Sequence, residues 1–379
     1  MDGPGGGGPL EGLRVVELAG IGAAPFACTV LADLGADVLR LGRPRERAGD
    51  AYDQLTRSRD SVALDLKHPD GRALAVSLAA RADALVESFR PGVAERLGVG
   101  PDDCLAANPR LVYARLTGYG QTGPLAARAG HDVNYLAQAG ALWPVGRSGE
   151  PPVPPLNYVG DFGGALFCVV GVLAAVMRAR ETGVGQVVDA AMVDAAAMMT
   201  AMTHSFLSVG FWREERGVNI LDTGAPFYDV YETSDHRYVA VGAIEPVFYA
   251  ALLEGLGLAE ADLGSQMDRD RWPQTKRAFA RVFAGATRDE WVERFAGTDA
   301  CVTAVLSPSE AVADAANAAR GVFSEHPPAA PSPAPRFSGT PARVSSGPST
   351  PGSGTDAGLA RWGVDEAERA RLRAAGAIA

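Results

Sequence analysis

Three ionisable positions stand where an apolar segment of the chain begins. His131 follows a glycine in front of an apolar stretch, Asp161 precedes the most apolar run, and Glu245 lies between a β-branched run and a proline. Histidine and carboxylate side chains give and take protons near neutral pH, which makes these residues candidates for acid and base catalysis. Helix capping explains each of them without any ligand; a helix N-terminus would lower the pKa of Asp161, whereas an apolar setting would raise it. The sequence alone does not bring the three positions together.

The other histidines carry weaker signals. His68, His236 and His326 lie in turns or beside prolines, where we expect solvated side chains. His204 follows a methionine-rich segment, where we expect a packed or capping residue. His131 is the histidine that the sequence singles out, because both of its ring nitrogens could meet solvent or substrate.

A second group of residues is suited to hold an anion. Gly20-Ile21-Gly22 separates a predicted strand from a predicted helix, as in dinucleotide sites, but the third glycine of that motif is missing. Four arginines follow within eight residues, and a phosphate-binding loop and a solvated charged loop explain them equally well. These arginines are Arg40, Arg43, Arg45 and Arg47.

Two further signals are weak when taken singly. Arg90 precedes a proline and a glycine at a helix start, where backbone amides attract anions, and Arg96 follows in the same helix. Helix-start chemistry explains the proline and the glycine without a ligand. Asp65, Leu66 and Lys67 come directly after a strand, at the sheet edge where α/β proteins bind ligands.

Length and charge limit the classes of function. The chain has 379 residues, with 35 Lys and Arg against 45 Asp and Glu, which gives a formal net charge of -10. An acidic molecule repels nucleic acid and anionic membranes, so we expect neither partner, and a local basic pocket for any anionic ligand. The apolar run 163–177 falls short of a membrane span and no secretory signal is present, so we expect a cytoplasmic protein. The scattered Cys28, Cys104, Cys168 and Cys301 fit reduced core residues and no metal site.

Short β-branched runs alternate with helical patterns from Leu13 onward, as in a parallel sheet covered by helices. This pattern predicts an α/β fold, with a large Rossmann-like domain over residues 1–223. Strands are expected at 14–18, 37–41, 62–64, 84–87, 112–116 and 186–189. Helices are expected at 25–34, 69–80, 92–97, 163–177 and about 192–209, the last with methionines that we assign mainly to core packing.

The pattern changes near Gly224, and a smaller α+β domain is expected over 224–326. Strands at 228–232 and 238–241 flank a hairpin turn, helices follow at 246–256, 273–283, 290–295 and 310–319, and a strand is expected at 301–306. Thr287 and Glu290 have the spacing of a capping box. Residues 327–379 begin with a Pro-, Ser- and Gly-rich crossing and end in a polar helix at 365–375, which we expect to return to the large domain.

Several longer motifs are distributed over almost the whole chain. They include GPLEGLRVVELAGIGAAPFACTVLADLGADVLRLGRP at 8–44, AGHDVNYLAQAG at 129–140, VPPLNYVGDFGG at 153–164 and YVAVGAIEPVFYAALL at 238–253. On these motifs the chain resembles the α-methylacyl-CoA racemases of the family III CoA-transferase (CaiB-BaiF) superfamily. The resemblance implies a homodimer of interlocked chains, an acyl-CoA thioester as substrate, and no metal or organic cofactor.

The resemblance also implies roles for particular residues. His131 and Asp161 would act as the acid and base pair, Glu245 would support the histidine, and the backbone N–H of Asp132 would meet the thioester oxygen. The reaction would invert the α-carbon of a 2-methyl-branched acyl-CoA by 1,1-proton transfer through an enolate. The residues implied to bind CoA are Arg43, Asp65, Leu66, Lys67, Arg90, Arg96 and Tyr135.

A CoA-transferase of the same superfamily is the main alternative, with Asp161 as the nucleophile that forms an acyl anhydride. His131 favours the racemase, because the transferases typically lack this histidine; they also carry a glycine-rich loop in place of the segment 243–246. A silent CoA or nucleotide binder is disfavoured by the presence of all three acid and base candidates. A nicotinamide oxidoreductase is disfavoured by the arginines after the second strand. The sequence does not identify the acyl chain of the substrate.

Overall fold

The computed structural model describes residues 7–44, 53–324 and 329–379 of the chain. The chain divides into two compact units. The first holds residues 1–139, 156–198 and 321–379, and the second holds residues 140–155 and 199–320. The second unit is therefore inserted into the first along the sequence. Residues 140–155 and 199–223, which the expected boundary assigned to the large domain, belong to the second unit.

Six parallel strands form the sheet of the first unit. They are β1 (Arg14–Leu18), β2 (Asp37–Gly42), β3 (Asp60–Ala63), β4 (Ala84–Glu87), β5 (Val112–Thr117) and β6 (Gln186–Ala191). Their order is β3-β2-β1-β4-β5-β6, and every neighbouring pair is parallel. The predicted α/β class is confirmed, and the chain order reverses between β1 and β4.

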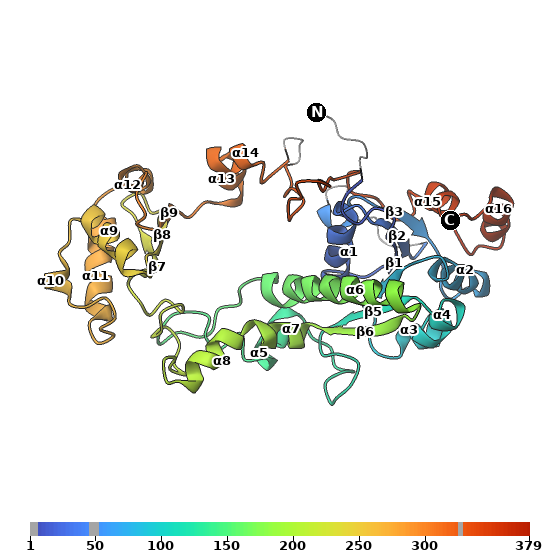
Figure 1. The fold of residues 1–379 in the computed structure, drawn as a ribbon, viewed down its shortest axis with the longest axis horizontal. Helices are drawn as coiled ribbons and strands as arrows, with labels where there is room; N and C mark the ends of the chain where they lie inside the picture. The colour runs from blue at the N-terminus through green and yellow to red at the C-terminus, as the bar shows by residue number, and fades with distance from the viewer. Residues whose placement is uncertain (1–6, 45–52, 325–328) are drawn as a thin grey trace. The chain divides into compact units, whose positions relative to one another are not determined.

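Helices cover both faces of this sheet (Figure 1). One face packs against α1 (Ala23–Asp33) and α6 (Gly163–Thr182), which share a core with β1, β4 and β5. The other face packs against α2 (Pro69–Ala79), α4 (Pro101–Ala107), α15 (Thr355–Arg361) and α16 (Glu366–Ala374). The unit also contains α3 (Val93–Leu97), α5 (Asp132–Gln138) and α7 (Met192–Met199).

Helix α6 is less buried than its composition predicts. Leu166, Phe167, Val170 and Met177 are exposed on it, with 74% exposure at Met177. The apolar segment is also longer than the sequence suggested: Tyr158–Thr182 passes the length and composition test for a membrane span, and half of its most apolar window is buried. The core helix of a soluble protein passes the same test. The burial that an apolar composition predicts is therefore wrong for one face of α6, which no residue that the structure describes covers.

The assignment of the methionines to the core is also wrong for most of them. Met198, Met199 and Met202 are exposed, whereas Met192 is buried. The expected single helix breaks at Thr200 into α7 and α8 (Ala201–Ser208). Among the cysteines, Cys28, Cys104 and Cys168 are buried as expected, but Cys301 is exposed in a left-handed turn, with φ 52°, directly before β9 (Val302–Ala304).

The C-terminal segment packs on the first unit, as predicted for the helix at 365–375. Its Pro-rich part is also fixed, since the backbone N–H groups of Gly354 and Ser58 donate to the carbonyl oxygens of Ser61 and Ser346 at 2.9 and 3.0 Å. The chain end continues this contact, because Ile378 forms a β-bridge with Leu64. The described part of the crossing, residues 329–355, is thus an ordered strap and not a free linker.

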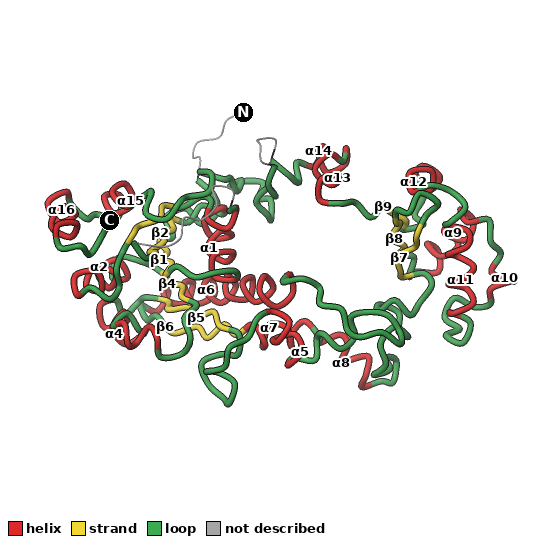
Figure 2. Tube along the Cα trace, turned by 180° about the vertical axis from the view of Figure 1, so that it is seen from behind, coloured by secondary structure: helices red, strands yellow, loops and turns green. Residues whose placement is uncertain are grey.

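The second unit is a three-stranded antiparallel sheet with helices (Figure 2). Its strands are β7 (Tyr228–Glu232), β8 (Tyr238–Gly242) and β9, and the predicted hairpin joins β7 to β8. Phe227, Phe279, Phe283 and Trp291 fill its core. Its helices besides α8 are α9 (Pro246–Leu256), α10 (Glu260–Leu263), α11 (Trp272–Phe283), α12 (Arg288–Phe295), α13 (Pro308–Ala313) and α14 (Ala315–Arg320), so the expected helix 310–319 is broken at Asp314.

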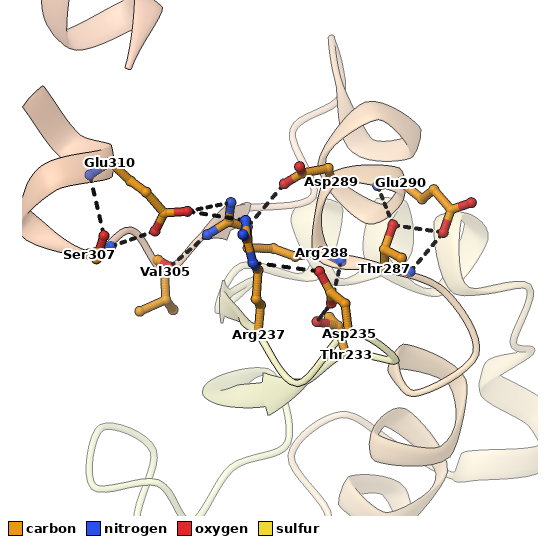
Figure 3. A network of polar contacts seen from close by, with 10 residues as sticks. All are labelled: Thr233, Asp235, Arg237, Thr287, Arg288, Asp289, Glu290, Val305, Ser307 and Glu310. Carbon is orange, nitrogen blue, oxygen red and sulfur yellow. Dashed lines mark hydrogen bonds and ion pairs between the residues drawn. The ribbon is translucent and has the colours of Figure 1, made fainter. Parts of the chain in front are cut away.

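Arg288 joins three parts of the second unit (Figure 3). Its guanidinium donates to Glu310 at 2.9 Å, and its backbone N–H donates to Asp235 in the β7–β8 turn at 3.1 Å. The hydrogen bond from Arg288 lowers the pKa of Glu310 to about 2. The predicted capping box of Thr287 and Glu290 is present beside it. These contacts fix the start of α13 to the hairpin.

Candidate active site

The candidate site of the first unit begins at the carboxyl edge of the parallel sheet. Open α/β sheets bind ligands where the strand order reverses, which here is between β1 and β4. The turns after these two strands approach each other closely, since a Cβ on Gly20 would lie 2.2 Å from Oγ of Ser88. Glycine at position 20 is required by this approach and does not need a nucleotide to explain it.

Asp161 lies in a π-helical turn, η2 (Tyr158–Phe162), that leads into α6. It is not the N-cap residue that the sequence suggested, because the turn extends the helix backwards by five residues. Burial raises the pKa of Asp161, the Asn157 amide at 3.5 Å lowers it, the negative charge of Asp132 raises it and the charge of His131 lowers it. The net shift is upward, as an apolar setting predicts.

His131 is the N-cap residue of α5, and its side chain is exposed. Its backbone N–H donates to Oδ1 of Asn134 at 3.1 Å, which fixes the start of the helix. Tyr135, one turn later, donates its hydroxyl to the carbonyl of Gly130, the residue that precedes the histidine. Two glycines leave space for this ring: a Cβ on Gly118 would lie 2.1 Å from Cε1 of Tyr135, and one on Gly130 would lie 2.8 Å from it.

Asp132 connects these two segments. Oδ2 of its buried carboxylate accepts the backbone N–H of Asp161 at 2.7 Å. The structure therefore brings His131, Asp132 and Asp161 together, which the sequence could not do. Burial and the nearby charge of Asp161 raise the pKa of Tyr135 to about 12, so its hydroxyl stays protonated and can donate.

Glu245 belongs to the second unit, whereas His131, Asp132 and Asp161 belong to the first. It occupies the N-cap position of α9, but its side chain makes no capping hydrogen bond and is exposed. The loop before it is fixed by Gln266, whose amide donates to the carbonyl oxygens of Ala243 and Ile244 at 3.1 and 2.8 Å. Capping therefore does not account for this glutamate.

Three of the expected anion-binding arginines are exposed at the carboxyl edge of the sheet. Arg43 follows β2, Arg90 follows β4, and Arg96 lies on α3. None of them has a hydrogen-bond or ion-pair partner within residues 7–44, 53–324 and 329–379. Arg40, by contrast, is buried against Ser61 and Glu17, so it is not available to a phosphate.

Two other arginines of that run, Arg45 and Arg47, lie outside the described residues. The segment Asp65, Leu66 and Lys67 follows β3 as expected. Oδ1 of Asp65 accepts the backbone N–H of Lys67 at 2.9 Å, and the N–H of Asp65 donates to the carbonyl of Ala377 at 2.9 Å. This turn is therefore shaped by local bonds and by the chain end.

Sequence reasoning missed Asn157 and Gly118. Asn157 precedes Asp161 by four residues, which is one helical turn, so the pair becomes visible once the turn 158–162 is included in the helix. Gly118 follows β5 and carries no sequence signal of its own, because its role depends on the distant ring of Tyr135. No group of three or more potential metal ligands is found among the described residues.

Comparison with known proteins gives the family. Residues 10–357 match the model of CoA-transferase family III. Alpha-methylacyl-CoA racemases of Mus musculus and Homo sapiens are 49% and 48% identical to this chain over 88% of its length and 87% of theirs. The beta subunit of succinyl-CoA--L-malate CoA-transferase from Chloroflexus aurantiacus is 34% identical over 66% of each chain.

Solved structures agree with this result. A CaiB/BaiF family protein from Brucella suis, 24% identical, has the same fold with a TM-score of 0.82 over 94% of this chain and 100% of its own. A Mycobacterium tuberculosis protein that is 27% identical reaches a TM-score of 0.77 over 94% of this chain and 100% of its own. The family match over most of the length, the relatives and the parallel sheet lead to one conclusion: this chain belongs to the family III CoA-transferases.

Proposed function

We propose that this protein is a racemase that inverts the α-carbon of 2-methyl-branched acyl-CoA thioesters. The observation that carries the proposal is the cluster of His131, Asp132 and Asp161, in which one buried carboxylate connects the segments of the two proton carriers. The racemase relatives support the same activity. The reaction needs no metal and no organic cofactor, since its steps are proton transfers.

The proposed chemistry begins with removal of the α-proton. A thioester α-proton is weakly acidic, so a base must take it while hydrogen bonds stabilise the enolate oxygen. In one direction His131 takes the proton from one face and Asp161 returns a proton to the opposite face; in the other direction the roles exchange. The amide of Asp132 is suited to the enolate oxygen, because the first N–H groups of a helix have no acceptor within it.

The raised pKa of Asp161 suits both of these roles. A carboxylate with a raised pKa holds a proton at higher pH, so its acid form is populated closer to neutrality. The same shift makes the ionised form a stronger base. Asn157 has the opposite effect, since its amide stabilises the charged form. The balance between burial and this amide sets the proton affinity of Asp161.

We further propose that CoA lies across the carboxyl edge of the sheet. Arg43, Arg90 and Arg96 would pair with its phosphates, because they are exposed and lack acidic partners among the described residues. The turn 65–67 would contact the nucleotide. The resemblance implies that Tyr135 contacts CoA. We propose that it also fixes the backbone in front of His131, through the hydrogen bond that its hydroxyl donates to the carbonyl of Gly130.

A homodimer and a supporting role of Glu245 for the histidine also remain proposals. The exposed apolar face of α6 supports the dimer, because its side chains gain a cover when a second chain binds. The absence of nucleic-acid and membrane partners is inferred from the acidic composition, and a cytoplasmic location stays a proposal as well. Sedimentation at micromolar concentration tests the dimer.

Proton NMR in D2O tests the activity. A single-epimer 2-methylacyl-CoA is incubated with the enzyme, without cofactor or acceptor acid. We expect loss of the α-proton signal and appearance of both epimers. His131→Ala and Asp161→Ala should each slow this exchange at least about 100-fold while the CoA ester still binds. His236→Asn, a change at an exposed hairpin histidine of the second unit, is the matched control and should leave the rate unchanged.

A CoA-transferase that uses Asp161 as nucleophile is the second candidate, supported by the transferase relative. In that reaction the carboxylate attacks the thioester carbonyl, CoA leaves as the thiolate, and an acyl anhydride forms. The same sample separates the two activities. If the α-proton persists, but CoA moves to a carboxylic acid added afterwards, the racemase proposal is wrong and the transferase is correct.

A further inference from the structure

The side chain of Asp132 holds the main chain of Asp161. Oδ2 of Asp132 accepts the backbone N–H of Asp161 at 2.7 Å. Asp132 is buried, with 6% of its surface exposed. A hydrogen bond to a charged acceptor is stronger than a neutral one. Gly160 makes the approach possible, because a Cβ there would lie 2.6 Å from the same oxygen. The turn that carries Asp161 is thus fixed to the first residue of α5.

The other oxygen of this carboxylate is unsatisfied. Oδ1 of Asp132 is buried and accepts no hydrogen bond from any residue that the structure describes. A buried acceptor without a donor lowers stability, and such groups in native proteins commonly have a functional cause. An asparagine oxygen could also accept the N–H of Asp161, in a weaker hydrogen bond, and would avoid a buried charge. The carboxylate therefore offers something that the hydrogen bond alone does not, namely its negative charge.

We propose that the Asp132 side chain is a positioning residue that ties Asp161 to the helix start beside His131 and holds a fixed negative charge against it. This goes beyond the role of the Asp132 backbone amide at the enolate oxygen. It rests on the proposed function only in taking Asp161 as a carrier of the transferred proton. By its charge, Asp132 makes the loss of a proton from Asp161 harder and makes the ionised Asp161 a stronger base.

The other groups around Asp161 do not provide this effect. Within its own segment Asn157 lowers the pKa of Asp161, and on α5 the charge of His131 also lowers it. Tyr135 stays neutral, because its pKa is raised to about 12. Helices α1 and α6 also contact this turn, and the first two turns of each contain no charged residue. Apart from burial, Asp132 is the group that raises the pKa of Asp161.

A carboxyl titration tests the proposal without any need for activity. The full-length protein is labelled with 13C at the aspartate carboxyl, and the Asp161 signal is assigned by its loss in Asp161→Asn. The titration midpoint of that signal is then compared between the wild-type protein and Asp132→Asn. We expect the midpoint to fall by about one pH unit, because a nearby like charge is removed while the hydrogen bond to the Asp161 N–H remains.

Asp189→Asn is the matched control. Asp189 also accepts a backbone N–H, from Gln121 at 2.9 Å, and lies in the same unit, but it is not among the charges that act on Asp161. This variant should leave the midpoint in place. Gly160→Ala is a second test, since its methyl group pushes the Asp132 carboxylate away and should also lower the midpoint.

The outcomes are distinct. A midpoint in Asp132→Asn within about 0.2 pH units of wild type, with the protein folded, overturns the proposal. In the active enzyme the acid limb of the pH–rate profile should move by the same amount as the midpoint, and a lower rate without such a movement would indicate a purely structural aspartate and overturn the proposal too. Wild-type protein that fails to exchange the α-proton contradicts the proposed function, yet the titration still decides the effect of Asp132.

Discussion

Gly118→Ala is expected to damage the site from a position outside the cluster of His131, Asp132 and Asp161. The added methyl carbon would lie 2.1 Å from Cε1 and 2.2 Å from Cζ of Tyr135. Since carbon atoms in contact lie about 3.5 Å apart, the ring must move by roughly 1.4 Å. That movement breaks the hydrogen bond from its hydroxyl to Gly130, the neighbour of His131.

The size of the effect follows from these contacts. Overpacking costs about 1–3 kcal/mol and the lost hydrogen bond about 1 kcal/mol, while alanine restricts the unfolded chain and recovers about 0.4–1 kcal/mol. The free energy of unfolding should therefore fall by about 1–3 kcal/mol. A displacement of about 1 Å at a proton carrier can slow turnover about 100-fold. We expect the loss of rate to exceed what the loss of stability explains at 25 °C.

Urea unfolding and the α-proton exchange assay measure the two effects. Gly347→Ala is the control, because a Cβ at position 347 has no atom within 4 Å and the backbone there is not left-handed. Tyr135→Phe removes only the hydroxyl and should reproduce the slower rate with a smaller loss of stability. Wild-type stability and rate in Gly118→Ala would refute the role assigned to the Tyr135 ring.

Two further predictions follow from the charges of the first unit. Arg90→Ala should raise KM for the acyl-CoA about 10-fold and change kcat little, since it removes a phosphate contact and no proton carrier; an unchanged KM in steady-state assays would exclude that contact. Arg57→Ala should lower the free energy of unfolding by about 3–5 kcal/mol, because it leaves the buried Asp33 carboxylate, now 2.6 Å from Nη2 of Arg57, without its partner. Urea unfolding that shows a loss below about 1 kcal/mol would contradict the second prediction.

The strands of the first unit were predictable because burial on both faces gives them short apolar runs that contain valine, such as those in Arg14–Leu18 and Ala84–Glu87. A smaller domain was predicted over 224–326, but the residues 140–155 and 199–223 that also belong to the second unit were not predicted, because the pattern changes visibly only near Gly224. The exposure of Met198 and Val170 could not be predicted either. The sequence does not show whether an apolar side chain packs in the core of its own chain or contacts a partner protein.

The sequence predicted the residues of the candidate site but not the contacts between them. His131 and Asp161 stood out by residue type, but the bond from Asp132 to the Asp161 amide joins positions 29 residues apart. The environment of Arg40 could not be predicted for a similar reason. In the sequence Arg40 belongs to a run of four arginines, while its neighbours in space are Glu17 and Ser61, which lie on strands β1 and β3.

The inserted second unit has a consequence for how the chain is made. The sheet of the first unit is encoded by residues up to 191, but Leu359, Trp362 and Ile378, which cover one of its faces, come from the last part of the chain. At 5–20 residues per second, a ribosome needs roughly 6 to 24 s to synthesise the intervening residues 199–320. During this interval the second unit is still being synthesised, and the face of the first unit that Leu359, Trp362 and Ile378 will cover stays exposed. We therefore expect chaperones to bind the nascent chain until Leu359, Trp362 and Ile378 have left the ribosome.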